Sequence, residues 1–432
     1  MHDICKTSFT RLIEKQEERL LLRVPFEVAQ DIESITISYA YTRHRTSSAA
    51  GGKTYRQEVN IVDLALEDAA HVLVGASGSR RSEITIHENY ATDGYRGVSI
   101  TPGIWYIILG AYKIEAEGCP VDITIVQKKK QTLLLKGDCH THTVHSDGWY
   151  TVEELISRAQ QDRLDFLFLA DHNSMASNAF IRSSPSLTIL PGVEATYYDG
   201  HCNLLGVARP IKTYVANSHE DILAILHEAK QNGALISLNH PIDPDCSWLL
   251  GFGEEVPADM VEIWNGPFTP WNQKSIDMWH GQLCKGRIWP AIGGSDCHHA
   301  ELFRTFATPA TCLYARSRAS SDILDAMKKG HAYIGMNPDA PSIYMEMGDA
   351  RMGDVAADFS ELLLRVGSLQ TGDEIRLINQ TGVIWKETAE ACFSYETTHR
   401  ITDSLFVRAE VRRQLPGIGQ TLASIGNPIY IR

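Results

Sequence analysis

The sequence lacks an apolar run long enough to cross a membrane, and it lacks an excess of basic residues. No segment approaches the roughly 18 to 20 consecutive apolar residues of a transmembrane helix, so we expect no membrane partner. The N-terminal stretch MHDICKTSFTRLIEKQEERLLLRV has no uninterrupted apolar segment of the kind found in a secretion signal. The formal charge of -13 argues against binding to a phosphate backbone, because no Lys/Arg stripe is present to release counterions. A long nucleic acid is therefore not expected as a partner.

Cysteine pairing motifs are also missing. The nine cysteines are odd in number and include no CxxC pair, which argues against a disulfide framework in a chain of 432 residues. We therefore expect reduced thiols and a cytoplasmic protein. Cys139, Cys202 and Cys297 each neighbour a candidate metal ligand, but we expect all three to be buried packing residues.

The pattern of apolar residues changes twice along the chain and predicts three domains. Residues 1–130 contain short alternating runs such as SITISYAYT and GIWYIILGAYKI, which predict an N-terminal β-sandwich. In that domain, GASGSRRSE at 75–83 is expected to be a hairpin turn rather than an extension toward a substrate. Residues 131–337 alternate strand, loop and helix, and residues 338–432 return to β-type runs that predict a small C-terminal β-domain. The lysine-rich KKKQ at 128–131 is expected to be a solvated linker between the first two domains.

The central segment has the alternation of strand and helix that is typical of a parallel sheet. Thr151 opens a capping box, Ser218 is a helix N-cap, and Gly233 and Gly330 end helices. Between the helices lie about seven or eight short apolar runs that predict strands, which implies an α/β fold closed into a barrel. The runs are TLLLKG, LDFLFLA, LTILPG, NLLGVA, ALISLN, MVEIW, IWPAIGG and TCLYA.

Nine residues of metal-ligand type lie in this segment, each where a short apolar run meets a turn. Imidazole and carboxylate side chains together suit Zn, Mn or Fe, and a set this large can hold about two or three ions. The C-terminal ends of the strands of a parallel barrel open on one face, where the active sites of such folds lie. The nine residues are His140, His142, Asp147, His172, Glu194, His201, His240, Asp296 and His298.

The order of these motifs resembles the polymerase-and-histidinol-phosphatase (PHP) superfamily over residues 131 to about 337. The matching elements are HxHxxxxD, the DH after the second strand, GVE, a later His before Pro, and the final SDCH. The segments SGSRRSEITI and GIWYIILGAYKI are also similar to the CehA/McbA-type branch of that superfamily. The resemblance implies a PHP-type distorted (β/α)7 barrel flanked by the N-terminal β-sandwich and the C-terminal β-domain.

The resemblance also implies a trinuclear site. Three divalent ions, the three carboxylates and one hydroxide would leave a charge of about +2, which suits a dianionic phosphate better than a neutral ester. We therefore predict that a metal-activated hydroxide hydrolyses a small phosphate ester, such as a nucleotide, a sugar phosphate or a short oligonucleotide end. In the implied assignment His140, His142, Glu194 and Asp296 bind one ion, Glu194 bridges to a second ion held by His201 and His240, and Asp147, His172 and His298 bind a third.

Five other polar residues near the motifs are candidates for catalysis, each with an ordinary structural alternative. Asp171 either orients the ligand that follows it or is a turn residue. Arg304 is either a clamp for phosphate or a partner in a surface ion pair. His299 and His145 are either general acids or solvated loop residues. Asn265 either contacts substrate or forms a turn.

Two other functions fit parts of the sequence. The CehA/McbA resemblance implies that a carboxylic or carbamic ester could be the substrate, and a fold with a metal centre does not separate the two chemistries. The other alternative is a non-catalytic β-sandwich binding protein with an inert barrel, against which the complete set of ligands argues. The oligomeric state does not follow from the sequence.

Overall fold

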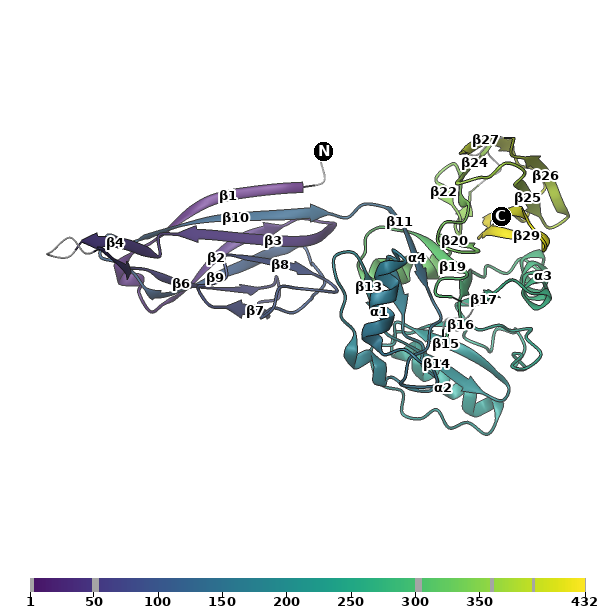
Figure 1. Ribbon diagram of the computed structural model, residues 1–432, viewed down its shortest axis with the longest axis horizontal. Coiled ribbons are helices and arrows are strands. Elements are labelled where there is room, and N and C mark those ends of the chain that lie inside the picture. The colour runs from purple at the N-terminus through teal and green to yellow at the C-terminus, as the bar shows by residue number, and fades with distance from the viewer. Residues whose placement is uncertain (1–3, 49–53, 300–304, 358–360, 391–392, 432) are drawn as a thin grey trace. The chain divides into compact units, whose positions relative to one another are not determined.

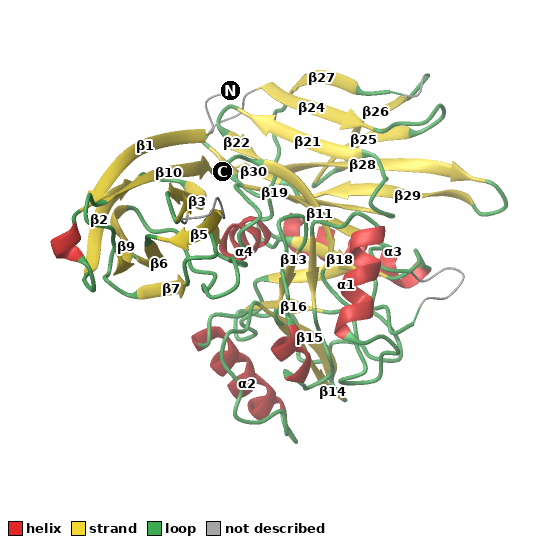
Figure 2. Ribbon diagram, turned by 60° about the vertical axis from the view of Figure 1, so that its left-hand side comes forward, coloured by secondary structure: helices red, strands yellow, loops and turns green. Residues whose placement is uncertain are grey.

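The computed structural model describes residues 4–48, 54–299, 305–357, 361–390 and 393–431 (Figure 1). The chain divides into two compact units, residues 1–131 and residues 132–432. Strands dominate both units, and the four α-helices of the described ranges all lie in the second unit (Figure 2). None of the helices in these ranges is long and apolar enough to span a membrane.

The first unit consists of two four-stranded antiparallel sheets around one apolar core. Side chains alternate along the strands, so that Ile35 and Ile37 of one sheet and Ile107 and Leu109 of the other are fully buried in that core. The first sheet has the strand order β1 (Ile4–Ile13), β10 (Cys119–Lys129), β3 (Ile32–Tyr41), β8 (Glu83–His87). The second has the order β2 (Leu21–Val28), β9 (Gly103–Lys113), β6 (Ile61–Glu67), β7 (Leu73–Ser77). The unit also contains a hairpin of β4 (His44–Ser48) and β5 (Thr54–Glu58) and a 3-10 helix, η1 (Lys15–Glu17).

Two predictions for this unit are wrong. The segment 75–83 does not form a hairpin, because β7 pairs with β6 while β8 pairs with β3, so the chain crosses there from one sheet to the other. The segment 128–131 is not wholly a linker, since β10 continues to Lys129 and Lys128 forms an ion pair of 2.6 Å with Glu33. Turn residues and lysines carry little information about which strands pair, because pairing depends on burial against distant neighbours.

The second unit contains two sheets whose strand ends meet at the candidate site. Just beyond those ends, isolated bridges between His172 and Glu194 and between Thr141 and Cys297 link one sheet to the other. A closed seven-stranded barrel stays a prediction. One sheet begins with β13 (Thr188–Leu190), β12 (Phe166–Phe168), β11 (Leu133–Asp138), β19 (Ala310–Ala315) and β20 (Ala332–Gly335), and the other runs β14 (Gly192–Tyr197), β15 (Gly200–Leu205), β16 (Leu235–Leu238), β17 (Met260–Asn265) and β18 (Ala291–Gly294).

The parallel sheet expected from the sequence forms only in part. β12 is parallel to β11 and β13, and β17 is parallel to β16 and β18, but β14 and β15 are antiparallel. Only Tyr198 and Asp199 connect β14 to β15, and a connection this short joins antiparallel strands. Glu194 therefore follows β13, as predicted, but lies inside β14, whereas His201 lies at the start of β15 and not at the C-terminal end of a strand.

Part of the chain after residue 337 continues the first of these sheets, and another part forms a separate four-stranded sheet. Tyr333 of β20 pairs with Gly426, so the sheet does not break at the predicted domain boundary. Leu167 and Val411, which lie on either side of that boundary, belong to one buried cluster. The C-terminal strands are β21 (Ser342–Met347), β22 (Ala350–Arg351), β23 (Val355–Ala356), β24 (Glu361–Gly367), β25 (Glu374–Asn379), β26 (Gly382–Thr388), β27 (Tyr395–Arg400), β28 (Phe406–Leu415), β29 (Gly419–Gly426) and β30 (Ile429–Ile431).

The helix signals in the sequence are confirmed. The Thr151 hydroxyl accepts from the N–H of Glu154, and the Glu154 carboxylate accepts from the N–H of Thr151, which completes the capping box. The Ser218 hydroxyl caps its helix by accepting from the N–H of Asp221, and Gly330 ends another helix with a left-handed φ of 74°. The helices are α1 (Val152–Gln161), α2 (His219–Gln231), α3 (Pro270–Cys284) and α4 (Ser320–Lys329), with a 3-10 turn, η2 (Ala176–Phe180).

Candidate metal centre

The first candidate ligands follow β11, whose last residue anchors them. Asp138 is fully buried, and its carboxylate accepts from the backbone N–H of His140 at 3.2 Å. The same carboxylate accepts from the N–H and the hydroxyl of Ser295 at 3.0 and 2.6 Å and from the N–H of Ala307 at 2.6 Å. The N–H of Asp296 donates in turn to the carbonyl of His140 at 2.9 Å. The segments that carry His140 and Asp296 are thereby tied together, and the His140 Nε2 lies 3.5 Å from the Asp296 Oδ1.

The next ligands are aligned by the bridge between the end of β12 and strand β14. The His172 Nδ1 lies 2.9 Å from the Glu194 Oε2 and 2.6 Å from the Thr196 hydroxyl oxygen. The Asn239 amide, which follows β16, donates to the Glu194 Oε1 at 2.9 Å. Three elements therefore fix the orientation of the Glu194 carboxylate, and its side chain is only 1% exposed.

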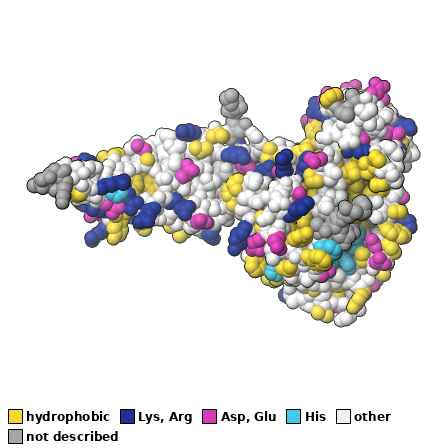
Figure 3. Space-filling view, in the orientation of Figure 1, with side chains coloured by type: hydrophobic (Ala, Val, Ile, Leu, Met, Phe, Trp, Pro, Cys, Tyr) yellow, Lys and Arg dark blue, Asp and Glu magenta, His cyan; other side chains and the backbone are white. Residues whose placement is uncertain are grey.

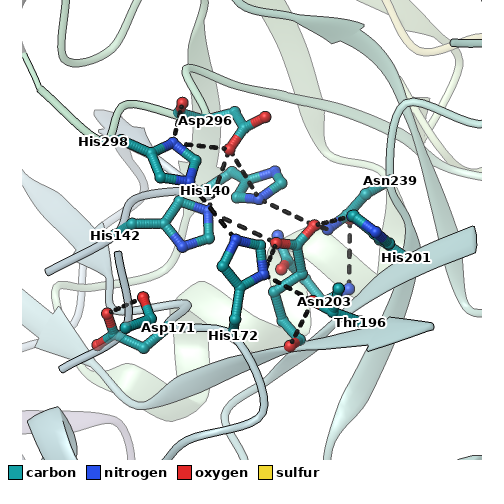
Figure 4. Close-up of polar contacts among 12 residues, drawn as sticks. His140, His142, Asp171, His172, Thr196, His201, Asn203, Asn239, Asp296 and His298 are labelled. Carbon is teal, nitrogen blue, oxygen red and sulfur yellow. Dashed lines mark hydrogen bonds and ion pairs between the residues drawn. The ribbon is translucent and has the colours of Figure 1, made fainter. Parts of the chain in front are cut away.

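Glu194 lies at the centre of the candidate site. Figure 4 shows the rings of His140, His142 and His172 turned toward one another there. Five imidazoles point at the two oxygens of Glu194, and the structure brings all nine predicted ligands into one cluster around it. The distances to the Glu194 oxygens are 3.3 Å from His140 Nε2, 3.5 Å from His142 Nε2, 2.9 Å from His172 Nδ1, 3.3 Å from His201 Nδ1 and 3.4 Å from His240 Nε2.

The ligand atoms of this cluster fall into three groups, each compact enough to surround one ion. Two of the groups share His142. The groups differ from the implied assignment because Cys246 joins His201 and His240, because His142 also belongs to the group of Asp147, and because Glu194 belongs to none of the three. The assignment of the nine residues to individual ions stays a prediction. The groups are His140, His142 and Asp296; His142, Asp147, His172 and His298; and His201, His240 and Cys246.

Two of the nine residues have a backbone conformation that costs energy. The φ angles of His240 and Asp296 are 29° and 50°, in the left-handed region that side chains with a Cβ disfavour. Such residues persist where the surroundings hold them, at about 1–3 kcal/mol each, and they concentrate at functional sites. Here the Glu262 carboxylate accepts from the N–H of His240 at 3.1 Å. The strain supports a functional rather than a packing role for this cluster.

The donor set fits bound divalent cations. The His140 Nε2 and the Glu194 Oε2 are buried and make no hydrogen bond within the described residues. The first of these atoms faces a carboxylate and the second faces an imidazole. Buried polar atoms are nearly always hydrogen-bonded, so unsatisfied nitrogen and oxygen atoms that converge on one point call for another partner. The mixture of imidazole and carboxylate suits Mn, Zn or Fe.

The Glu194 carboxylate and the His140 imidazole each stabilise the charged form of the other. Burial raises the pKa of Glu194, but the imidazoles of His140, His172 and His201 outweigh it and hold this pKa well below its usual range. Burial also lowers the pKa of His140, and the carboxylates of Glu194, Asp296 and Glu262 outweigh that effect and hold the pKa well above its usual range. Glu194 is therefore ionised and available as a ligand at neutral pH.

The sequence analysis missed Glu262, which supports ligands from two of the groups. Its side chain is fully buried in β17, and its Oε1 lies 3.0 Å from the His140 Nδ1. A carboxylate only accepts, so with an ion bound at Nε2 the His140 ring would donate to Glu262 from Nδ1. Asn265 donates to Glu262 at 3.0 Å and to Asp296 at 3.4 Å, so it is not merely a turn residue. The available signal was a carboxylate inside the apolar run MVEIW.

Cysteines lie beside several of the ligands. Cys139, Cys202 and Cys297 are fully buried, which confirms that they are packing residues. Cys246 was not singled out from the sequence, yet its sulfur lies 3.1 Å from the His240 Nδ1. This contact fixes the ring that presents Nε2 to Glu194, a role that metal-site histidines usually assign to a carboxylate or a carbonyl.

Comparison with known proteins gives short sequence matches and distant structural neighbours. No family model matches the chain. The chain is 39% identical over 70 residues to the 5'-3' exoribonuclease Rnm of Escherichia coli (strain K12) and 37% identical over 70 residues to that of Salmonella typhimurium. Each match covers 15% of this chain, and the chain spans about a quarter of the length of these curated relatives, 24% in both cases.

Three solved structures match parts of this chain at low sequence identity. A two-domain protein of Bacteroides vulgatus, described as containing a PHP-like metal-dependent phosphoesterase, has 17% identity and a TM-score of 0.43 over 68% of this chain and 95% of its own. A metal-dependent phosphoesterase of Bifidobacterium adolescentis has 17% identity and a TM-score of 0.28 over 39% and 90%. An amidohydrolase of Chromobacterium violaceum has 15% identity and a TM-score of 0.28 over 38% and 88%.

The other predicted catalytic residues lie around the ligand cluster or outside the described residues. The Asp171 carboxylate accepts from the N–H of Thr143 at 2.7 Å and from the hydroxyl of Ser146 at 2.8 Å. It therefore holds the loop that leads to the candidate ligand Asp147, and its role in orienting a ligand stays a prediction. Arg304 lies outside the described residues.

His145 and His299, the two histidines that flank candidate ligands in the sequence, stack on aromatic rings. His299 lies over Trp149 with ring centres 4.2 Å apart, and His145 lies over Phe180 at 5.1 Å. Neither ring lies in the cluster around Glu194. A role for either as general acid stays a prediction.

Proposed function

We propose that this protein is a metal-dependent phosphoesterase of the PHP superfamily that acts on a small phosphate ester. The observation that carries the proposal is the gathering of nine ligand-type side chains in one cluster, in which five imidazoles face the buried Glu194 and in which buried nitrogen and oxygen atoms lack hydrogen bonds within the described residues. The resemblance to PHP proteins and the match to an exoribonuclease support a reaction at phosphorus. We propose a small anionic substrate and no long nucleic acid, because the chain is acidic.

About two or three ions of Mn, Zn or Fe would be held by the three ligand groups. Bound ions would lower the pKa of water toward neutrality, orient a phosphoryl oxygen and neutralise the charge that develops in the displacement. A centre with an excess of positive charge favours a phosphate dianion over a neutral ester. This charge balance is the reason for preferring phosphate over the carboxylic or carbamic ester.

The substrate would enter from the side of the cluster that faces solvent. His140 and His142 are fully buried, whereas the Asp147 side chain is 59% exposed and His172 and His298 are about a quarter exposed, at 25% and 26%. Figure 3 shows histidine side chains at the surface of the second unit, among acidic ones. Asp171 positions the loop of Asp147 at this open side, and the Thr196 hydroxyl holds the His172 ring through its Nδ1. His299 is the proposed donor of a proton to the leaving oxygen.

A pair of chromogenic esters of the same phenol tests the choice of substrate. With Mn or Zn restored, we expect faster release of the phenol from the phosphate monoester than from the carboxylic ester, after subtraction of the spontaneous rates. The double variant His140→Ala, His142→Ala should lose bound metal and release from both esters. Equal or faster cleavage of the carboxylic ester by the unmodified protein would contradict the phosphoesterase proposal and favour the carboxylic or carbamic ester hydrolase.

A further inference from the structure

A cavity of about 480 Å³ adjoins the candidate metal centre on the side of the β14–β15 hairpin. Its wall includes Thr196 and His201, which belong to the cluster around Glu194. The Thr196 hydroxyl oxygen is 2.6 Å from the His172 Nδ1, and the His201 Nδ1 is 3.3 Å from the Glu194 Oε1. A group attached to a phosphate at the centre can therefore extend into this cavity. Its volume is that of a pocket for a small molecule.

The rest of the wall is largely aromatic and aliphatic. Tyr197 and Tyr214 line the cavity with Val215 and Ala216. The hydroxyl oxygens of both tyrosines are buried away from solvent, so the surface that they offer to the cavity does not include a phenol hydroxyl. Burial also raises the pKa of Tyr214 to about 12, so that ring is uncharged at neutral pH. Aromatic walls of this kind bind flat rings by stacking or by edge contacts.

The charge of the wall differs from that of the metal centre. Among the described residues that line the cavity, none is lysine or arginine, and Asp245 contributes a carboxylate. A second phosphate or a carboxylate placed here would meet no lysine or arginine side chain among these residues and would be repelled by Asp245. The cavity therefore suits an uncharged group, while the centre beside it suits the phosphate.

We propose that this cavity receives an uncharged ring of the substrate, so that the protein prefers phosphate monoesters of ring-bearing alcohols to short alkyl phosphates and to esters with a second anionic group. Tyr214 is the specificity-determining residue of the cavity. The inference rests on the phosphoesterase function proposed above, and it narrows the substrate to one phosphate joined to an uncharged aromatic group. It disfavours sugar bisphosphates and bisphosphorylated nucleotides.

Three phosphate esters with similar alkyl leaving groups test the inference on the full chain loaded with Mn. We expect a KM for benzyl phosphate about tenfold below that for ethyl phosphate, from the stacking of one ring. The KM for 4-carboxybenzyl phosphate should exceed that for benzyl phosphate. Equal KM values for the three esters would overturn the inference and leave the phosphoesterase function standing, whereas no phosphate release from any ester would reject the function itself.

Variants of Tyr214 locate the effect. Tyr214→Ala should raise the KM for benzyl phosphate about tenfold and lower the ratio of kcat/KM for benzyl phosphate to that for ethyl phosphate. Tyr214→Phe keeps the ring and should resemble the unmodified protein. If Tyr214→Ala does not fold, competitive inhibition of the unmodified protein by benzylphosphonate and ethylphosphonate gives the same comparison, and equal inhibition constants would overturn the inference.

Discussion

Replacement of Glu194 with glutamine is expected to release bound metal and to reduce phosphoesterase activity by more than about a hundredfold. Loss of a residue that only supports a ligand costs about 10- to 100-fold in metal affinity or activity, and Glu194 is itself a candidate ligand. Five imidazoles face its oxygens, so the change removes the one carboxylate shared by the whole cluster. Metal content after gel filtration and the rate of phosphate release measure the two effects.

A matched control for this change is Asp259→Asn. The Asp259 carboxylate accepts from Lys230 at 2.5 and 2.6 Å and from the N–H of Ile236 at 2.8 Å, outside the cluster. We expect this variant to keep its metal and its activity. If Glu194→Gln binds as much metal as the control and remains as active, Glu194 is not a ligand.

Replacement of Glu262 with leucine is expected to weaken metal binding by about 10- to 100-fold. Leucine fits a buried strand but leaves the His140 Nδ1 and the N–H of His240 without their acceptor. His140 is then free to change its tautomer and its ring orientation, and the strained backbone of His240 loses its restraint. Titration of the metal-free protein with Mn, followed by calorimetry, measures the loss. Glu262→Gln keeps one acceptor oxygen and should recover part of the affinity.

A variant of a second buried carboxylate, Glu410, distinguishes an effect on the position of the ligands from an effect on the stability of the fold. Glu410 is 3% exposed and pairs with Arg408 at 2.6 Å, in β28. Glu410→Leu leaves a buried arginine unpaired and should cost about 3–5 kcal/mol of stability without changing metal affinity. If Glu262→Leu lowers the stability and leaves the metal affinity intact, as expected of Glu410→Leu, then Glu262 is a structural residue and not a support for ligands.

The cluster could be predicted from the sequence because each ligand type stands beside a short apolar run. His140 and His142 after TLLLKG, and Asp296 and His298 after IWPAIGG, are brought together by the backbone bonds around Asp138. The position of His201 was predicted less well, because YYDG shows a turn without showing that only two residues connect β14 and β15. The antiparallel hairpin nonetheless places His201 opposite Thr196 and near Glu194.

The supporting residues were harder to find in the sequence than the ligands. Glu262 sits inside an apolar run, and its role depends on contacts with His140 and His240 that no spacing reveals. Cys246 lies in a loop without a motif and reaches His240 only through the fold. The C-terminal strands show the same limit, since their alternation predicts β-structure but not the pairing of β29 with β20.

The most direct test of the metal-dependent phosphoesterase hypothesis is a titration of the metal-stripped protein with Mn, in which bound ions per chain and phosphate release are measured on the same samples. The hypothesis predicts that activity is absent at the start and rises with binding until about two or three ions are bound. Binding of well under one ion per chain, or phosphate release that does not change as ions bind, would contradict it.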